Sequence, residues 1–196
     1  MIDPKALDKL VENSISIVSF KDGKVHSARM IRDARVDWSG RVYLGFPKDS
    51  QLAGFLKNTD AFTLSVLMEG TNASEYENLF LRFDMDYYAH DSKFHGLKCI
   101  KRDRNGLYSI TECTNAIISC KIDEIIEYRY SCRIYGSVTE SRLLHDNPTL
   151  TDDVYRRTLK KRFAAYVCVS CGMLYHLEYT EADYCVYCNG RLWPIF

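Results

Sequence analysis

The sequence lacks a long hydrophobic run, an excess of either charge and a leader-like start. No apolar stretch approaches the roughly 18 residues that cross a bilayer, which excludes a membrane-spanning helix. Lys and Arg number 26, and Asp and Glu also number 26, so no overall field draws the chain to nucleic acid or anionic lipid. The first residues hold no basic segment followed by an apolar one, which argues against a secretory signal and predicts a cytoplasmic protein.

Motifs of hydrolases and phosphotransferases are also missing. The chain shows no Ser-His-Asp order, no constellation of paired acids and no glycine-rich phosphate loop, so hydrolysis and phosphoryl transfer are unsupported. Internal repeats and low-complexity tracts are absent as well. The 196 residues, 46% of them hydrophobic, instead predict one folded domain of ordinary size with a small appendage.

Strand-like alternation and turn signals dominate the first three quarters of the chain. A short helix is expected after Asp3-Pro4, and Asp22-Gly23 is typical of a tight turn between two strands. The remaining expected elements are strands at 41–46, 61–68, 107–111, 115–127 and 130–143 and helices at 51–57 and from residue 74. A closed or half-closed sheet is the natural way to bury so many strands, which predicts a mainly β fold with a few helices.

The strongest signal is a pair of Cys-x-x-Cys motifs, Cys168 with Cys171 and Cys185 with Cys188, separated by thirteen residues. Four thiolates on two tight turns can surround one metal ion, and metal binding then supplies the folding energy that about 30 residues cannot draw from a core. Buried free thiols or a thiol–disulfide redox pair explain this double spacing less well. An all-sulfur site suits both a single iron and zinc, so the spacing leaves the metal open.

The other four cysteines form no metal motif. They lie on or beside the expected strands, and we expect buried, inert thiols there. These residues are Cys99, Cys113, Cys120 and Cys132.

The corner Lys48-Asp49-Ser50 lies where a strand is expected to end and a helix to begin. A helix N-terminus, a hydroxyl and an ammonium group together suit a phosphate, so Lys48 and Ser50 are candidate phosphate ligands. A plain helix N-cap explains Ser50 equally well.

The order of these features resembles the flavin reductase-like split barrel over residues 12–144. The features that carry the resemblance are the turn at Asp22-Gly23, the corner at 48–50, the strand 61–67, the run Lys93-Phe94-His95-Gly96-Leu97 and the strand 117–122. The aromatic residues and glycines around the four paired cysteines, such as Tyr166, Gly172 and Trp193, resemble rubredoxin. A barrel joined to such a module is similar to the high-molecular-weight rubredoxins, in which FMN and one iron share a chain.

The resemblance implies a role for particular residues. Ser27 and Arg29 lie on the strand that follows the flavin in that family, and Lys48 and Ser50 would hold the FMN phosphate. His95 would approach the nicotinamide side of the flavin, as the candidate catalytic residue. Arg32 and Arg35, like Arg29, suit a phosphate or the pyrimidine edge, or else a solvated strand face.

These features predict an FMN-binding split barrel at 1–145, a connector helix at 146–164 and a rubredoxin-like metal domain at 165–196. Electrons would pass from NAD(P)H, or from a separate reductase, through FMN to the iron at Cys168, Cys171, Cys185 and Cys188, and on to a redox partner protein. The resemblance also implies a homodimer. The alternative is a split barrel, with or without flavin, whose zinc ribbon is a structural or interaction module. Nucleic acid is not an expected partner, because the metal domain is acidic.

Overall fold

The structure is a computed structural model of the chain. It divides into two compact units, Met1–Asp152 and Asp153–Phe196. The residues that it describes are 2–23, 25–70, 79, 83, 93–94, 97, 99–155, 165–168, 170–171, 174–176, 188 and 190–195.

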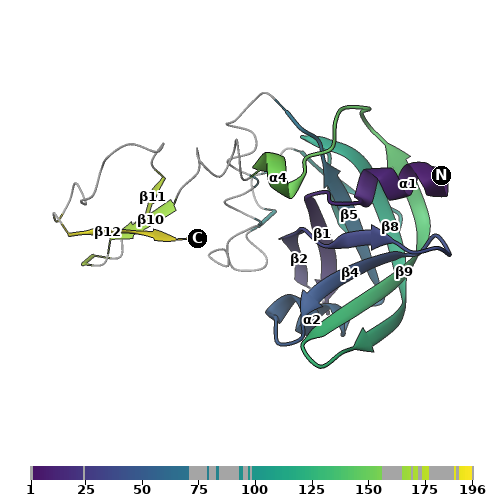
Figure 1. The fold of residues 1–196 in the computed structure, drawn as a ribbon, viewed down its shortest axis with the longest axis horizontal. Helices are drawn as coiled ribbons and strands as arrows, with labels where there is room; N and C mark the ends of the chain where they lie inside the picture. Colours follow the sequence, from purple (N-terminus) through teal and green to yellow (C-terminus); the bar gives the residue numbers. More distant parts are fainter. Residues whose placement is uncertain are drawn as a thin grey trace. The chain divides into compact units, whose positions relative to one another are not determined.

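The first unit is built mainly of strands (Figure 1). The helices of this unit whose bounds the structure describes are α1 (Pro4–Val11), α2 (Gln51–Leu56) and the short α4 (Asp152–Val154), which spans the division between the units. Its strands are β1 (Ser16–Asp22), β2 (Val25–Ile31), β3 (Ala34–Val36), β4 (Val42–Pro47), β5 (Ala61–Leu67), β6 (Ile100–Arg102), β7 (Tyr108–Ile110), β8 (Thr114–Glu127) and β9 (Ser131–Leu143). The predicted mainly β class is confirmed.

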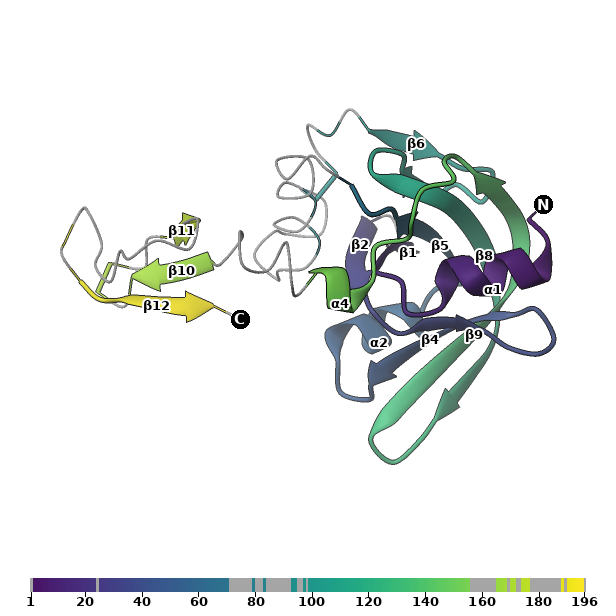
Figure 2. The ribbon, with the colours of Figure 1, turned by 45° about the horizontal axis from the view of Figure 1, so that its top comes forward.

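Seven of these strands form one sheet in the order β2-β1-β5-β8-β9-β4-β3. The two end strands, β2 and β3, are not paired with each other, so the curled sheet stays open along one side among the described residues (Figure 2). The predicted hairpin joins β1 to β2, and Gly23 has the positive φ of 58° that its turn needs. Strand β3, which has three residues, was not predicted.

The predicted strand at 107–111 is not continuous with the main sheet. Its residues form β7, which pairs with β6 in a separate two-stranded sheet. This small sheet covers the outer face of β5, where the Ile110 N–H donates to Ser65 Oγ at 2.9 Å and Asn105 Nδ2 donates to Thr63 Oγ1 at 2.9 Å. Small hydroxyl side chains let the second layer approach closely while its polar groups find partners.

The long strands β8 and β9 turn the corner of the barrel. The first half of β8 pairs with β5, and the first half of β9 pairs with β4, while the two strands pair with each other along most of their length. Register shifts between Ser119 and Cys120 and between Ile122 and Glu124 mark the bend. Bulges increase local twist, which lets two strands serve both halves of the curled sheet.

The core fills the concave side of this sheet. Its members come from all the long strands and include Val18, Phe62 and Ile118, each fully buried. Leu7 and Val11 of α1 belong to the same cluster, as the predicted apolar face of that helix requires. Phe55 of α2 stacks on Phe20 with ring centroids 6.0 Å apart.

The chain after β9 remains attached to the first unit beyond the predicted boundary at residue 145. The Leu150 carbonyl accepts from the Ile15 N–H at 2.8 Å, and the Leu150 N–H donates to the Leu67 carbonyl at 2.9 Å. The division between the units therefore falls after Asp152. Most of the expected connector helix lies outside the described residues, as does most of the helix expected from residue 74.

The second unit holds a three-stranded antiparallel sheet in the order β11-β10-β12. Its strands are β10 (Ala165–Cys168), β11 (Leu174–His176) and β12 (Leu192–Ile195). Cys168 ends β10 opposite Leu192, the first residue of β12. The turn after β10 and the chain that enters β12 therefore meet at one end of the sheet.

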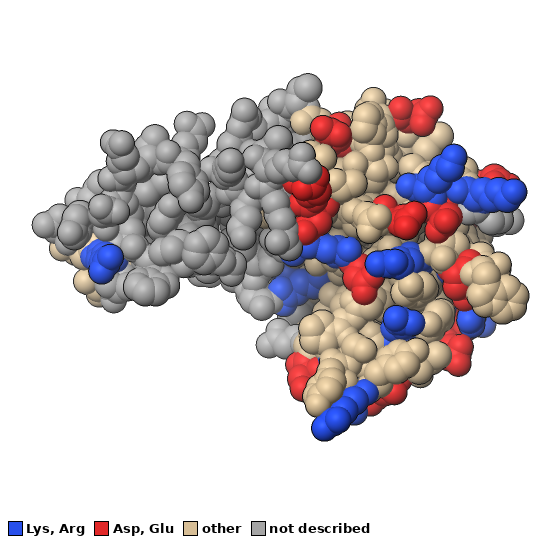
Figure 3. Space-filling view, viewed as in Figure 1, with Lys and Arg blue, Asp and Glu red and all other residues tan. Residues whose placement is uncertain are grey.

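The surface of the first unit carries mixed charges. Lys and Arg are interspersed with Asp and Glu over the face seen in Figure 3, with no large area of one sign among the described residues. This agrees with the equal numbers of acidic and basic residues in the sequence. None of the helices within the described part of the chain has the length and hydropathy needed to cross a membrane.

A substitution of Gly136 on β9 tests how tightly the residues pack where β8 and β9 bend. A Cβ atom there would lie 2.8 Å from Phe62 Cε1 and 3.0 Å from the Lys121 carbonyl oxygen. We expect Gly136→Ala to lower the free energy of unfolding by about 1–3 kcal/mol through overpacking, measured by urea denaturation.

Gly54→Ala is the matched control, because a Cβ on this helical glycine meets nothing within 4 Å. The control should gain about 0.5–1 kcal/mol from helix propensity. A Gly136→Ala protein as stable as wild type would show that the corner is looser than this packing indicates.

Candidate functional site

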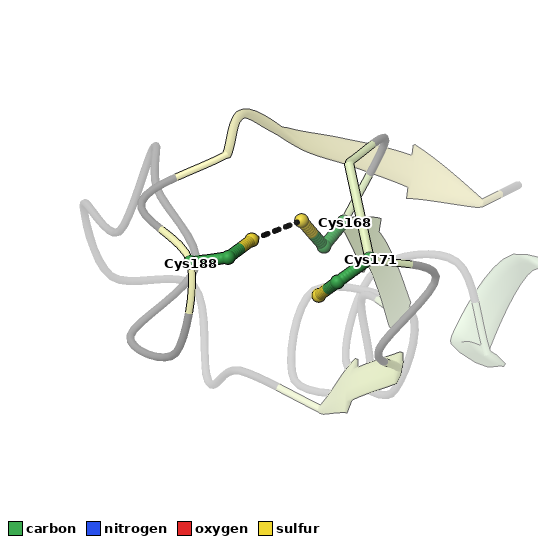
Figure 4. A group of neighbouring side chains, drawn as sticks. All are labelled: Cys168, Cys171 and Cys188. Carbon is green, nitrogen blue, oxygen red and sulfur yellow. Dashed lines mark hydrogen bonds between the residues drawn. The ribbon is translucent and has the colours of Figure 1, made fainter.

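Three cysteines meet at the end of the second unit's sheet. Cys168, Cys171 and Cys188 have sulfur atoms that all lie within 4.8 Å of one another, and the sulfurs of Cys168 and Cys188 are 3.4 Å apart. Figure 4 shows the three side chains directed towards a common centre. Thiolates around a tetrahedral zinc or iron ion lie about 3.8 Å apart, so this donor set fits such an ion.

The sequence brings these sulfurs together through turns at both ends. Cys168 is the last residue of β10, Cys171 lies on the turn that follows, and Cys188 precedes β12. Cys168 is 1% exposed, whereas Cys171 and Cys188 are exposed. The fourth expected ligand, Cys185, lies outside the described residues.

The surroundings of Cys168 favour its thiolate form. Burial raises the pKa of this thiol, but hydrogen bonds from the backbone N–H groups of Cys171 and Ser170, together with the neighbouring thiols, lower the pKa overall. A thiolate is the form that binds a metal, and backbone donors to sulfur also tune a bound ion.

Gly190 allows the two turns to approach each other. A Cβ atom at this position would collide with the Ser170 side chain and lie 2.9 Å from the Cys168 sulfur. Only glycine leaves room for the second turn beside the first.

Two predicted cofactor residues lie on β2, at the open side of the barrel. Ser27 pairs with Phe20 and Arg29 pairs with Val18, and directly paired residues share a face of the sheet. Phe20 and Val18 belong to the core, so Ser27 and Arg29 lie on the inner face. Ser27 is buried and Arg29 is half-buried, a hydroxyl and a guanidinium at the margin of the core.

The other two predicted cofactor residues lie at the junction of β4 and α2. Ser50 is the N-cap of α2, and its Oγ accepts from the Ala53 N–H at 3.2 Å. Lys48 Nζ lies 3.1 Å from Glu127 Oε2, and Lys57 Nζ lies 2.5 Å from the other oxygen of that carboxylate. Glu127, which reaches this corner from the end of β8, was not predicted. Lys57 and then Lys48 lower its pKa through hydrogen bonds.

The structure pairs two further candidate arginines with acids. Arg32 Nε lies 3.1 Å from Asp152 Oδ1, and Arg35 Nε lies 3.4 Å from Asp33 Oδ1. Both pairs are on the surface of the first unit. His95, the candidate catalytic residue, lies outside the described residues.

Four thiols of the first unit are buried, as predicted. They are Cys99, Cys113, Cys120 and Cys132. Burial raises the pKa of Cys99 to about 11 and raises that of Cys120 further. Protonated thiols of this kind are poor nucleophiles and poor ligands.

Sequence reasoning missed Lys93, whose side chain is fully buried. Its Nζ donates to the Ala28 carbonyl on β2 at 3.2 Å. Burial and the nearby Arg29 charge lower the pKa of this lysine to about 8. The run 93–97 belongs to the family resemblance, but a lysine in a sequence normally indicates exposure, so no local signal predicts its burial.

Comparison with solved structures places this fold among flavin reductases. A flavin reductase domain protein from Arthrobacter sp. FB24 matches with a TM-score of 0.57 at 12% identity, over 70% of this chain and 80% of that one. An NADH:FAD oxidoreductase from Streptomyces globisporus C-1027 matches with a TM-score of 0.57 at 18% identity, over 73% and 86%. The flavin reductase component of a bacterial two-component tryptophan halogenase matches with a TM-score of 0.58 at 14% identity, over 76% and 99%.

The predicted split-barrel fold is thereby confirmed. No protein-family model matches the sequence, and no curated protein matches it. At these identities the likeness concerns the fold.

Gly190→Ala tests the geometry of the cysteine cluster. The added methyl group would push the turn that carries Cys188 away from Cys168. We expect a roughly tenfold or greater loss of metal affinity, because residues that support ligands commonly contribute that much. The measurement is competition of the full chain with a chromophoric chelator for Zn²⁺ or Co²⁺. Gly54→Ala, in the other unit, is the control, and equal affinity of Gly190→Ala and wild type would contradict the geometry.

Proposed function

We propose that the chain is an electron-transfer flavoprotein, in which the split barrel holds FMN and the second unit holds one iron. The observation that carries this proposal is the convergence of three cysteine sulfurs in a chain whose other unit has the fold of flavin reductases. Bound flavin accepts two electrons from a reduced nicotinamide and releases them singly, and an iron tetrathiolate accepts one electron at a time.

The residues of this chain have separate tasks in the proposal. Ser27 and Arg29 face the flavin from the inner side of β2, while Lys48 and Ser50 bind its phosphate. His95 approaches the nicotinamide side. Cys168, Cys171, Cys185 and Cys188 hold the iron, and their backbone donors stabilise negative sulfur.

Partners complete the proposal. NAD(P)H or a separate reductase delivers electrons, a redox partner protein receives them, and two copies of the chain form a homodimer. One of the solved structures with this fold is a flavin reductase complexed with NADP+, which supports the nicotinamide as donor.

A second candidate function shares the same observation. Three thiols within 4.8 Å of one another also suit zinc, which has no redox chemistry and would make the second unit a structural or interaction module. The identity of the native metal separates the two functions.

Metal and flavin content of the purified chain tests the proposal. We expect one iron for each chain, thiolate-to-iron charge-transfer bands and bound FMN, measured by elemental analysis and visible spectra. Cys171→Ser should abolish the iron bands and leave the flavin bound, because the two sites lie in different units. Cys99→Ala, which removes a thiol outside the cluster, should retain both. Stoichiometric zinc in the native protein would exclude the one-iron function.

The phosphate corner is tested by comparing FMN with riboflavin. Lys48→Met should weaken FMN binding about two- to fivefold and leave riboflavin binding unchanged, as the loss of one exposed charge contact predicts. Glu127→Gln should have the opposite effect, because it releases Lys48 and Lys57 from their shared carboxylate. Both constants come from quenching of flavin fluorescence.

The control for this corner is Lys121→Met, which removes an exposed lysine elsewhere on β8. It should change neither constant. Equal losses of FMN and riboflavin affinity in Lys48→Met would place the phosphate away from this corner.

A further inference from the structure

Burial of the Lys93 side chain lowers the stability of the fold unless its ammonium group finds a partner. Its side chain is completely buried, and a charged group loses its hydration there. An apolar side chain of similar length, such as methionine, would fill the same space without this penalty. The ammonium group adds a hydrogen bond from Nζ to the Ala28 carbonyl, across 65 positions of sequence.

Ala28 lies on a strand that needs a second partner. Among the described residues β2 pairs with β1 alone, and no second strand from that part of the chain pairs with its other edge. A buried backbone carbonyl that lacks a partner is unfavourable, and Ala28 is fully buried. Lys93 supplies a hydrogen-bond donor to this carbonyl.

The residue that follows Lys93 fixes the same strand at a second point. The Phe94 ring lies 5.1 Å from the Tyr108 ring, which in turn lies 4.5 Å from the His26 ring on β2. Lys93 is therefore tied to β2 at Ala28 by a hydrogen bond, and Phe94 is linked to His26 of β2 through the ring of Tyr108. Such a double attachment restrains both the position and the rotation of the strand.

This attachment acts on the face of β2 that carries the candidate cofactor residues. Ala28 stands between Ser27 and Arg29, and side chains alternate between the two faces of a strand. A strand held at the Ala28 carbonyl presents its two neighbours to the inner side. If the strand rotated, both side chains would be displaced together.

We propose that Lys93 is a positioning residue for the cofactor, which holds the edge strand β2 at Ala28 so that Ser27 and Arg29 face the flavin. This inference rests on the proposed flavin-binding function. Lys93 itself acts through the Ala28 carbonyl of the backbone.

The first test measures the strand itself, without cofactor. Hydrogen–deuterium exchange of the flavin-free full chain should show about tenfold faster exchange in peptides covering 25–31 in Lys93→Met, and wild-type exchange in Lys93→Arg, which keeps a charged donor. Lys101→Met, which removes an exposed lysine on β6, is the control. Unchanged exchange at 25–31 in Lys93→Met would refute the positioning role, whatever the cofactor.

The second test measures FMN. Lys93→Met should bind FMN about tenfold more weakly and alter the visible circular dichroism of the bound flavin, while Lys93→Arg restores both. A purely structural lysine would lower the urea midpoint of Lys93→Met but leave the dissociation constant and the dichroism of the folded fraction unchanged, which would overturn the proposal.

Two outcomes keep the proposals distinguishable. If wild-type protein binds no flavin while exchange at 25–31 responds to Lys93, the proposed function fails, and Lys93 remains a strand restraint without a cofactor role. If Lys93→Met does not fold, Lys93→Gln retains a neutral donor and takes its place in both tests, with a smaller effect expected in the same direction.

Discussion

The arrangement of the candidate cofactor residues depends on the position of β2 at the end of the main sheet. A barrel that closed completely would pair β2 with β3, satisfy both strands and leave no gap beside the core. Here β2 is paired with β1 alone among the described strands, and its Ala28 carbonyl accepts a hydrogen bond from Lys93. The aromatic group of Phe94, Tyr108 and His26 lies on the outer side of this strand. The inner side of the same strand is left as the margin of the core, where a hydroxyl and a guanidinium lie.

The second unit must be stabilised in a different way, because it is too small for an apolar core of its own to hold it together. Its short strands bring three sulfurs to one end of the sheet, and Gly190 gives the turns the space to approach. Metal–sulfur bonds can then replace the missing apolar burial. This role in folding is the same for iron and for zinc. Electron transfer makes an additional demand, a metal with two accessible oxidation states, so folding and redox function impose separate requirements on one set of ligands.

The features that could be predicted from the sequence are those that depend on a few neighbouring residues. Asp22-Gly23 predicted the β1–β2 turn because its geometry needs a residue that accepts positive φ, and the double Cys-x-x-Cys spacing predicted the sulfur cluster. The short strand β3 and the pairing of β6 with β7 were missed, since each of these strands has only three residues and shows no alternation of its own. The contacts of Lys93 with Ala28 and of Lys48 with Glu127 were beyond local reasoning as well. Each joins residues more than 60 positions apart, and no periodicity in the sequence records such a pair.

These two lysines show how burial decides what an ammonium group can do. Lys48 is 42% exposed, and an exposed ion pair contributes only about 0–1 kcal/mol, so its contact with Glu127 is easily exchanged for another anion. A flavin phosphate carries more negative charge than the carboxylate and would compete well for the same lysine. The observed pair is therefore compatible with a phosphate site. Lys93 is in the opposite situation, because a buried ammonium that loses its acceptor has no water to replace it. The exposed lysine can change partners during a binding cycle, whereas the buried one fixes a strand.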